Sequence, residues 1–329
     1  MLSSHKHETS GKSLHQEDSS GTATFSAGSR VITITYGSEK VTGFEKGLLL
    51  GKRVLITGGG TGLGKSIGER FLSLGAQLAI CGRRKEVLDD TAAEFRAKFG
   101  SNVQTVQCDV RSPDDVEGML DQVWQAGPVD VLVNNAAGNF IAQTHKLSSR
   151  AIDSVLGICL HGTAYCTTGA GRRWIEGSHA GTVLSILTLS ALQGGPFTVP
   201  SAMAKAGIDA MTKSLAVEWG PKGIRLVAVV PGSFPTEGAT SRLSVGSGAS
   251  DSGAPLQRHG EHIELANLCA FLVSDLASYI TGETVVIDGG RRYLGGARGG
   301  VAEMLRWSDE DWDRRRAQMP SRQDRPPSK

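Results

Sequence analysis

The sequence lacks several features that mark common classes of protein. No apolar run approaches the roughly 20 residues that a membrane-spanning helix needs, and the first residues lack the basic-then-apolar pattern of a secretory signal. The formal net charge is only +2, because 35 basic side chains nearly balance 33 acidic ones, which disfavours nucleic acid or an anionic membrane as a partner. We therefore expect a soluble protein that acts on a small molecule.

Metal-ligand spacing is also absent among the cysteines, which are odd in number and so do not suggest a disulfide framework. They lie in apolar or strand-like contexts, at Cys81, Cys108, Cys159, Cys166 and Cys269. This pattern predicts reduced core thiols in a cytoplasmic protein that has no metal site.

Composition divides the chain into three parts. Residues 1–45 are rich in Ser, Thr, His and Gly and are expected to form a disordered extension, although 31–36 alternates like a short edge strand. The single arginine of that extension argues against a mitochondrial transit peptide. Residues 46–298 form the expected folded domain, and 299–329 read as a short helix that continues into a disordered tail.

Within the folded part, strand-like and helix-like patterns alternate. The strand-like segments are 54–56, 77–81, 103–110, 129–133, 181–186, 224–230 and 283–290, and helical spacing is found at 152–172, 202–219 and 262–274. Alternation of this kind predicts an α/β fold in which a single doubly wound parallel sheet of the Rossmann type carries helices on both faces.

A glycine-rich turn, residues 57–64, joins the first strand to a helix with Leu63, Ile67 and Phe71 spaced four apart. Glycines let the backbone turn sharply and approach a ligand closely, and the N-terminus of a helix favours a pyrophosphate. The turn therefore predicts a dinucleotide site, in which the candidate residues are Thr57, Gly58, Gly60, Thr61, Gly62 and Leu63.

The end of the second strand lacks the acidic residue that favours NAD at the adenosine ribose. It reads Gly82-Arg83-Arg84 instead. Arginines at this place can pair with a 2′-phosphate, so Arg83 and Arg84 favour NADP(H), the alternative being an ordinary solvated basic turn.

Several motifs together resemble the short-chain dehydrogenase/reductase family. The glycine-rich turn has its Thr-Gly-x3-Gly-x-Gly spacing, and Asn134-Asn135-Ala136-Ala137-Gly138 matches its Asn-Asn-Ala-x-Gly marker. The continuation Asn139-Phe140 is similar to the 2,4-dienoyl-CoA reductase branch and its bacterial relatives. Segments 200–207, 231–239 and 241–243 also match, so the resemblance covers about residues 46–295.

This resemblance implies further binding residues. Asp109 and Val110 would lie at the adenine, and Asn135, Ala136, Ala137, Lys205, Pro231, Gly232 and Thr236 would complete the cofactor site. Asn139, Phe140 and Arg242 would face a CoA-like substrate, with 239–255 as a mobile loop over it. The family also implies a homotetramer or homodimer.

The expected catalytic tyrosines are missing. Most members of the family use a Tyr-x3-Lys pair, but this chain reads Ser201-x3-Lys205. The dienoyl branch carries a different tyrosine eleven residues earlier, where this chain has Ser190. A serine hydroxyl is a far weaker acid than a phenol, so another group must stabilise and protonate the product anion.

His161 and Thr188 are the candidates for that task. Alignment of the following Gly-Thr-Ala puts His161 where the dienoyl branch has an asparagine that helps to hold the thioester oxygen. A histidine can donate both a hydrogen bond and a proton, although a lone helical histidine is often structural. Thr188 matches the family's active-site serine or threonine. Tyr165, one turn after His161, is expected to pack in the core.

The leading hypothesis is an NADPH-dependent reductase of a conjugated enoyl or 2,4-dienoyl thioester, within fatty acid metabolism. One alternative is a carbonyl reductase or dehydrogenase with another substrate. Another is a protein without redox activity, serving as a scaffold, cyclase or isomerase, which the two serines at the tyrosine positions favour.

Overall fold

The computed structural model describes residues 22–27, 30–35, 44–45, 47–236, 253–294, 304–305 and 307–317. The chain divides into two units, residues 1–45 and 46–329. In the first unit, β1 (Thr22–Ala27) pairs with β2 (Arg30–Thr35) as an antiparallel hairpin. The strand predicted at 31–36 corresponds to β2, whereas β1 was not predicted. The remainder of the predicted disordered extension lies outside the described residues.

The second unit contains a seven-stranded sheet. Its strands are β3 (Arg53–Thr57), β4 (Gln77–Gly82), β5 (Gln104–Gln107), β6 (Val131–Asn134), β7 (Gly181–Ile186), β8 (Ile224–Pro231) and β9 (Thr284–Ile287). They lie in the order β5-β4-β3-β6-β7-β8-β9, and every pairing described in this sheet is parallel. The order reverses between β3 and β6, and such a switch point is where open α/β sheets bind ligands.

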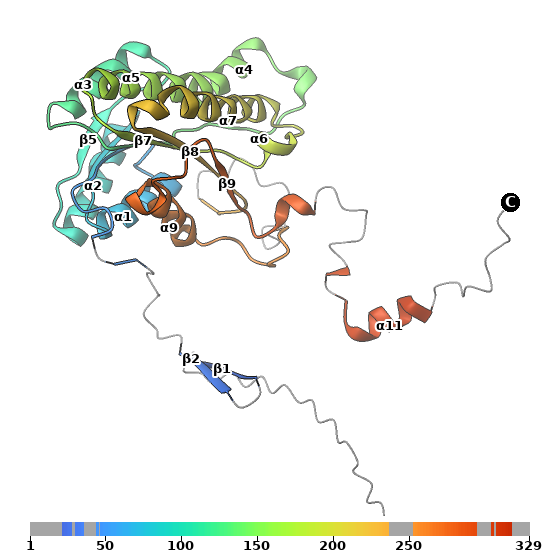
Figure 1. The fold of residues 1–329 in the computed structure, drawn as a ribbon. Helices are drawn as coiled ribbons and strands as arrows, with labels where there is room; N and C mark the ends of the chain where they lie inside the picture. The colour runs from blue at the N-terminus through green and yellow to red at the C-terminus, as the bar shows by residue number, and fades with distance from the viewer. Residues whose placement is uncertain are drawn as a thin grey trace, which may run out of the picture. The chain divides into compact units, whose positions relative to one another are not determined.

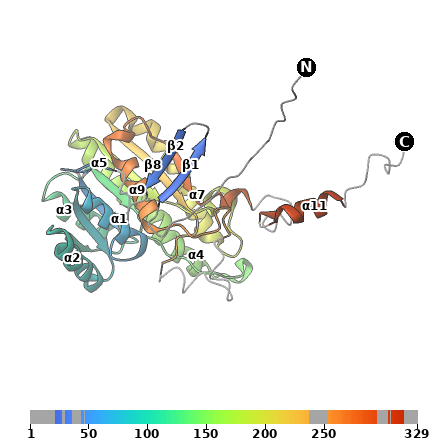
Figure 2. The same cartoon turned by 90° about the horizontal axis from the view of Figure 1, so that it is seen from below.

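Helices cover both faces of the sheet (Figure 1). One layer contains α1 (Gly62–Ser73), α2 (Lys85–Phe99) and α9 (His262–Val273); the other contains α3 (Pro113–Trp124), α4 (Ser149–Leu156), α5 (Gly162–Glu176) and α7 (Val199–Trp219). Seen from below, α9 lies beside α1 (Figure 2). The doubly wound α/β prediction is therefore confirmed.

Shorter elements complete the description. The helix α6 spans Ser190–Gln193, and 3₁₀ turns span Thr144–Lys146, Gly220–Lys222, Asp275–Ala277 and Arg291–Tyr293. In the predicted C-terminal tail, α11 (Asp309–Ala317) corresponds to the expected short helix. Among the described helices, none has the length and apolarity needed to cross a membrane.

Two predicted strands were drawn too long, and one predicted helix is interrupted. The helix predicted at 152–172 is interrupted by a π-helical turn, Gly157–His161, between α4 and α5. The strand predicted at 103–110 is ordered as β5 only to Gln107. The strand predicted at 283–290 ends at Ile287, because the Asp288 carboxylate accepts hydrogen bonds from the backbone N–H groups of Gly290 and Arg292 and turns the chain.

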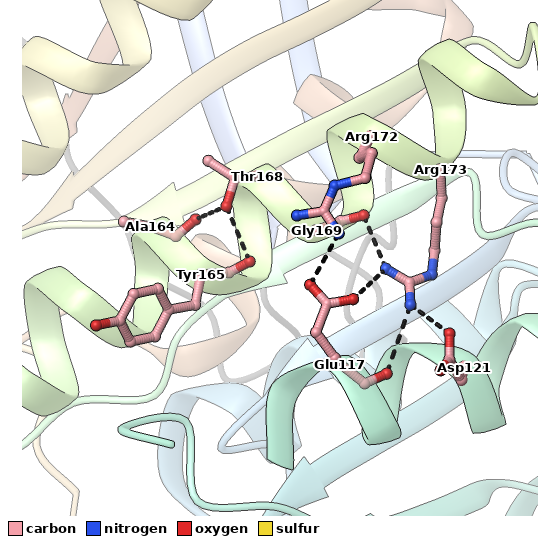
Figure 3. Close-up of polar contacts among 8 residues, drawn as sticks. All are labelled: Glu117, Asp121, Ala164, Tyr165, Thr168, Gly169, Arg172 and Arg173. Carbon is pink, nitrogen blue, oxygen red and sulfur yellow. Dashed lines mark hydrogen bonds and ion pairs between the residues drawn. The ribbon is translucent and has the colours of Figure 1, made fainter. Parts of the chain in front are cut away.

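The contact between α3 and α5 is both polar and tight (Figure 3). Arg173 on α5 donates to Glu117 and Asp121 on α3, and Arg172 donates to Glu117. Gly169 is part of this network, because its carbonyl accepts from Arg173 at 3.1 Å, and a Cβ atom on it would be 2.5 Å from Leu120 Cδ1. The missing side chain thus lets α5 approach α3, while the arginines bridge the two helices.

On its other side, α5 meets the end of α7 through Gly171. A Cβ atom there would lie 2.4 Å from Cη2 of Trp219, a distance that real Cβ contacts do not reach. Because Trp219 is buried beside the sheet, the ring has little room to move. Gly171 therefore fixes how closely α7, which carries Lys205, packs against α5.

We predict that Gly171→Ala destabilises the protein by about 1–3 kcal/mol, since overpacking of the Trp219 ring outweighs the gain in helix propensity. Gly118→Ala on α3 is the matched control, because that glycine is exposed and has no atom within 4 Å of its Cβ position. It should stabilise the protein by about 0.5–1 kcal/mol. Urea unfolding measures both; equal effects of the two changes would contradict the packing account.

Candidate active site

The glycine-rich turn lies against the carboxyl end of β6. Gly58 has φ +66°, in the left-handed region that glycine adopts easily, and its N–H donates to the Cys81 carbonyl at 2.8 Å. A Cβ at Gly64 would lie 2.4 Å from Asn135 Nδ2, and one at Gly58 would lie 3.1 Å from the Ala136 Cα. Glycine at both positions is thus required by close approach.

Thr57 and Asn135 hold this approach together. The Thr57 hydroxyl accepts the backbone N–H groups of Asn135 and Ala136, both at 3.0 Å, and the Asn135 amide donates to the carbonyls of Thr57 at 3.0 Å and Gly58 at 3.2 Å. Thr57 is buried, and these side chains face the protein rather than the open side of the turn. The side chains of Thr57 and Asn135 therefore shape the turn where the cofactor is expected to bind.

The N-terminus of α1 suits an anion. The preceding residue, Thr61, makes no capping hydrogen bond with its side chain, and the first turn of α1 contains no acidic residue. The positive end of the helix dipole is thus not neutralised from within the helix, which fits a pyrophosphate. Leu63 is half-buried in that same turn.

The neighbouring glycines connect this turn to the elements around it. Gly60 packs on α2, with its carbonyl accepting from the Thr91 hydroxyl at 2.9 Å. Gly62 has φ +55°, and its Cβ position lies 3.4 Å from the Thr236 methyl group. Pro231 ends β8, and Gly232 follows it so close to Asp288 that a Cβ would lie 2.6 Å from the Asp288 Cα. The predicted cofactor residues that follow β3 and β8 therefore lie close together at the carboxyl ends of these strands.

Where the adenosine is expected, Asp109 lies near Arg83 and Arg111, and the Asp115 carboxylate accepts the Asp109 N–H at 3.2 Å. Arg111 donates from its backbone N–H and its guanidinium to Asp109, and this pairing, with a smaller effect from nearby Arg83, lowers the pKa of the Asp109 carboxyl group. Arg83 and Arg84 are exposed. Exposed guanidinium groups of this kind can pair with a phosphate. Arg111 was not among the predicted residues. The one feature of the sequence that could have indicated its role is its position two residues after Asp109. Val110, between them, is buried.

At the other end lies Lys205, which is 3% exposed on the inner face of α7. Its ammonium group donates to the Ile186 carbonyl at 2.6 Å, and burial lowers the pKa of that ammonium. Ser201 is buried one turn earlier on the same helix. The predicted lysine thus sits at the carboxyl end of β7.

Two hydroxyls lie just beyond β7. Thr188 Oγ1 is 2.6 Å from Ser190 Oγ, so one of these hydroxyls donates to the other. Both residues are half-buried. Gly195 makes room for them, since its Cβ position is 2.7 Å from both Ser190 Cβ and Thr198 Oγ1. The structure therefore joins two of the predicted catalytic residues into one polar pair.

His161 has a different environment from these groups. It is exposed at the end of the π-helical turn, and its described ring contact is with Tyr165, at 6.2 Å between centroids. Cys159, in the same turn, lies beside Lys205. Its thiol forms hydrogen bonds with the backbone N–H and carbonyl of Gly138. Cys159 was predicted only as a core thiol. Whether His161 acts in catalysis stays a prediction.

The predicted substrate residues lie in three settings. Asn139 accepts the Phe140 N–H with its side chain at 2.9 Å, and the Phe140 ring packs against the buried cluster of Val155, Cys159 and Ala204. Ala137, just before them, is exposed. Arg242 and most of the predicted loop at 239–255 lie outside the described residues, as the structure resumes at Gly253.

Comparison with known proteins decides the family. The family model described as Enoyl-(Acyl carrier protein) reductase matches residues 58–292, which begin at the second residue of the glycine-rich turn. The chain belongs to the short-chain dehydrogenase/reductase family. Members of this family use nicotinamide cofactors, and the uncapped N-terminus of α1 together with the glycine cradle fits such a dinucleotide.

Individual members of this family are similar to this chain over most of their length. The chain is 43% identical over 282 residues to an uncharacterized oxidoreductase of Caenorhabditis elegans, covering 83% of this chain and 90% of that protein. It is 40% identical over 245 residues to a protein of Bacillus subtilis named a probable 2,4-dienoyl-CoA reductase that produces (2E)-enoyl-CoA, covering 73% and 96%. A solved short chain dehydrogenase from Bacillus anthracis superposes with a TM-score of 0.67 at 42% identity, covering 73% and 96%.

The buried Lys205 should leave a signature in stability. Because its folded pKa is lowered, the folded state binds fewer protons than the unfolded state between that pKa and the unfolded value of about 10.4. The free energy of unfolding should therefore rise with pH across this window. We predict that the wild type gains stability relative to Lys205→Met between about pH 7 and about pH 10.

Urea unfolding of the cofactor-free proteins at the two pH values measures this difference. Lys213→Met, which removes an exposed lysine from the same helix, is the control. Parallel pH dependence of the wild type and Lys205→Met would contradict the assignment of a buried, destabilised charge.

Proposed function

We propose that the protein is an NADPH-dependent reductase of a conjugated enoyl or 2,4-dienoyl thioester. The observation that carries this proposal is the pairing of Thr188 and Ser190 at 2.6 Å beyond β7, with buried Lys205 at the end of the same strand. This end of the site offers the Ser190 hydroxyl where the dienoyl branch places a phenol, with the Thr188 hydroxyl beside it. A weakly acidic site suits a substrate whose developing charge is spread by conjugation.

The cofactor assignment to NADP(H) is supported by charge. Arg83 and Arg84 present exposed guanidinium groups after β4, whereas Arg111 is paired with Asp109. A 2′-phosphate would pair with the exposed guanidinium groups through charge-assisted hydrogen bonds. The pyrophosphate would bind at Thr61–Gly62 and the nicotinamide ribose at Lys205.

The chemistry adds one hydride and one proton across the conjugated system and leaves an oxidised cofactor. NADPH, when bound, supplies the hydride. The residues of this chain would hold the substrate against it and bind the thioester oxygen as negative charge develops there, through the Thr188–Ser190 pair. The proton would then come from His161 or from water, and Lys205 would favour the anion by its charge.

The substrate class is supported by the names of relatives and by the sequence at the strand ends. Relatives in Bacillus subtilis and in Danio rerio, the latter 36% identical, are named 2,4-dienoyl-CoA reductases. Asn139 and Phe140 would border the acyl chain, and Arg242 would meet a CoA phosphate. A homotetramer or homodimer is part of the proposal. A cytoplasmic location is also part of it, because the described cysteines are free and buried.

An NADPH-consumption screen over enoyl-CoA, dienoyl-CoA and ketone substrates tests this function. We expect turnover with a conjugated acyl-CoA and little with ketones or alcohols. Preferential turnover of ketones would instead identify a carbonyl reductase. Tight NADPH binding without oxidation by any of these substrates would favour a role without redox chemistry.

The cofactor assignment predicts that NADPH binds at least about tenfold more tightly than NADH, since one charge-assisted arginine contact supplies more than about 1.4 kcal/mol. Arg83→Ala should remove most of that preference, whereas Arg96→Ala, which changes an exposed arginine at the far end of α2, should not. Fluorescence titration with both nucleotides measures the ratio. Equal affinities in the wild type would contradict the assignment.

The proton source is tested by His161→Asn, which keeps a hydrogen-bond donor but removes the titrating ring. If His161 is the acid, turnover should fall about 10²–10⁴-fold. NADPH affinity should be nearly unchanged. Adding Ser190→Tyr should then restore activity through a phenol. Full activity of His161→Asn would point to water as the proton source.

A further inference from the structure

The segment after β8, residues 232–236, is held by residues that precede and begin α9. The Ser233 hydroxyl is 2.8 Å from Nδ1 of His259, and the Gly260 N–H donates to the Ser233 carbonyl at 2.9 Å. Gly260 also lies against the Phe234 ring, so close that a Cβ would be 2.3 Å away. Two polar contacts and one tight packing contact therefore fix the first half of this segment.

The second half is held by His262, the first residue of α9. Its Nε2 lies 2.8 Å from the Pro235 carbonyl, and its Nδ1 lies 2.9 Å from the Ser66 hydroxyl on α1. One imidazole thus links three parts of the chain: α9, the segment after β8, and the helix whose N-terminus suits the pyrophosphate.

This link stays closed whether the ring is neutral or protonated. The Pro235 carbonyl can only accept, so Nε2 carries a hydrogen in both forms. When the ring is neutral, the Ser66 hydroxyl donates to Nδ1. When the ring is protonated, Nδ1 donates to Ser66, whose own hydrogen then goes to the Gly62 carbonyl, 3.2 Å away. The bridge is therefore a geometric constraint rather than a pH switch.

The bridge sets the spacing between two binding elements. Pro235 is followed at once by Thr236, whose methyl group lies 3.4 Å from the Cβ position of Gly62, the first residue of α1. Ser66 is one turn further along that helix. The bridge therefore joins the segment that carries Thr236 to the first two turns of α1 through one imidazole.

We propose that His262 is a positioning residue for the dinucleotide: by joining Ser66 to the Pro235 carbonyl, it holds Thr236 against the N-terminus of α1 and raises cofactor affinity. The inference rests on the proposed cofactor site. It assigns to a residue outside that site the task of keeping its two halves in register. Preorganisation of this kind lowers the free-energy cost of binding.

Three substitutions separate the two bonds of the bridge. His262→Val removes both. His262→Gln places an amide near Nε2 and can keep the bond to Pro235, whereas His262→Asn places one near Nδ1 and can keep the bond to Ser66. His179→Val, at an exposed histidine before β7, is the matched control. Calorimetric titration gives the dissociation constants for NADPH and NADH, and the cofactor-free melting temperature reports the fold.

We expect His262→Val to weaken binding of the preferred nucleotide about tenfold, because the segment that carries Thr236 is then no longer joined to α1 through the imidazole and must be ordered when the cofactor binds. Gln and Asn should give intermediate losses, and His179→Val none. Turnover at saturating cofactor should change far less than affinity. Ser66→Ala should weaken binding in the wild type but add nothing to His262→Val, since the partner is already gone.

Unchanged affinity in His262→Val, or a Ser66→Ala effect that simply adds to it, would overturn the inference. If His262→Val does not fold, full wild-type affinity in both the Gln and Asn variants would overturn it equally. A wild-type protein that binds neither nucleotide would refute the proposed cofactor site and this inference together. Normal wild-type binding with unaffected variants would refute the inference alone.

Discussion

The hydrogen bonds from the Asn135 amide to the carbonyls of Thr57 and Gly58 are the constraint on which the site depends. They tie the end of β3 to the end of β6 at the point where the strand order reverses. Gly64, in the first turn of α1, lies against the same amide. This close contact fixes where α1 begins, with its N-terminus at the carboxyl ends of the strands. A larger side chain at Gly64 would displace the whole anion-binding end.

The two ends of the site differ in how far their charged groups are exposed to water. At the proposed adenosine end, Arg83 and Arg84 are exposed, so water screens their charges. At the other end, the Lys205 ammonium group is buried and donates to the Ile186 carbonyl. A negative charge that develops nearby would pair with this buried ammonium group. Because burying the ammonium without such a partner is unfavourable, the site favours formation of the anion in the proposed reaction.

Much of the fold could be predicted from the sequence because the responsible signals are local. The glycine-rich turn, the bounds of β7 and the start of α9 at His262 all follow from patterns within a few residues. Strand ends were less predictable, because β9 stops where Asp288 captures the backbone beyond it. The two hydroxyls at Thr188 and Ser190 were both candidates, but their pairing was not expected.

What the sequence did not reveal depends on contacts between distant residues. Ser66 and His262 are separated by 196 positions, and no spacing rule relates them. The environment of Cys159 depends on α7 folding over it and on Gly138 arriving from another strand. Arg242 illustrates a different limit, because its role concerns a segment outside the described residues.

The π-helical turn at Gly157–His161 has a consequence for reading this helix by periodicity. An α-helix advances about 100° for each residue, and a π turn accommodates one extra residue without lengthening the ladder by a full turn. Side chains on either side of Gly157–His161 therefore follow two helical wheels, offset from each other. Counting steps of four across the turn assigns the wrong face. Removing one residue from it would rotate Gly162–Glu176 as a body, carrying Gly169 and Gly171 away from the helices that they allow to approach.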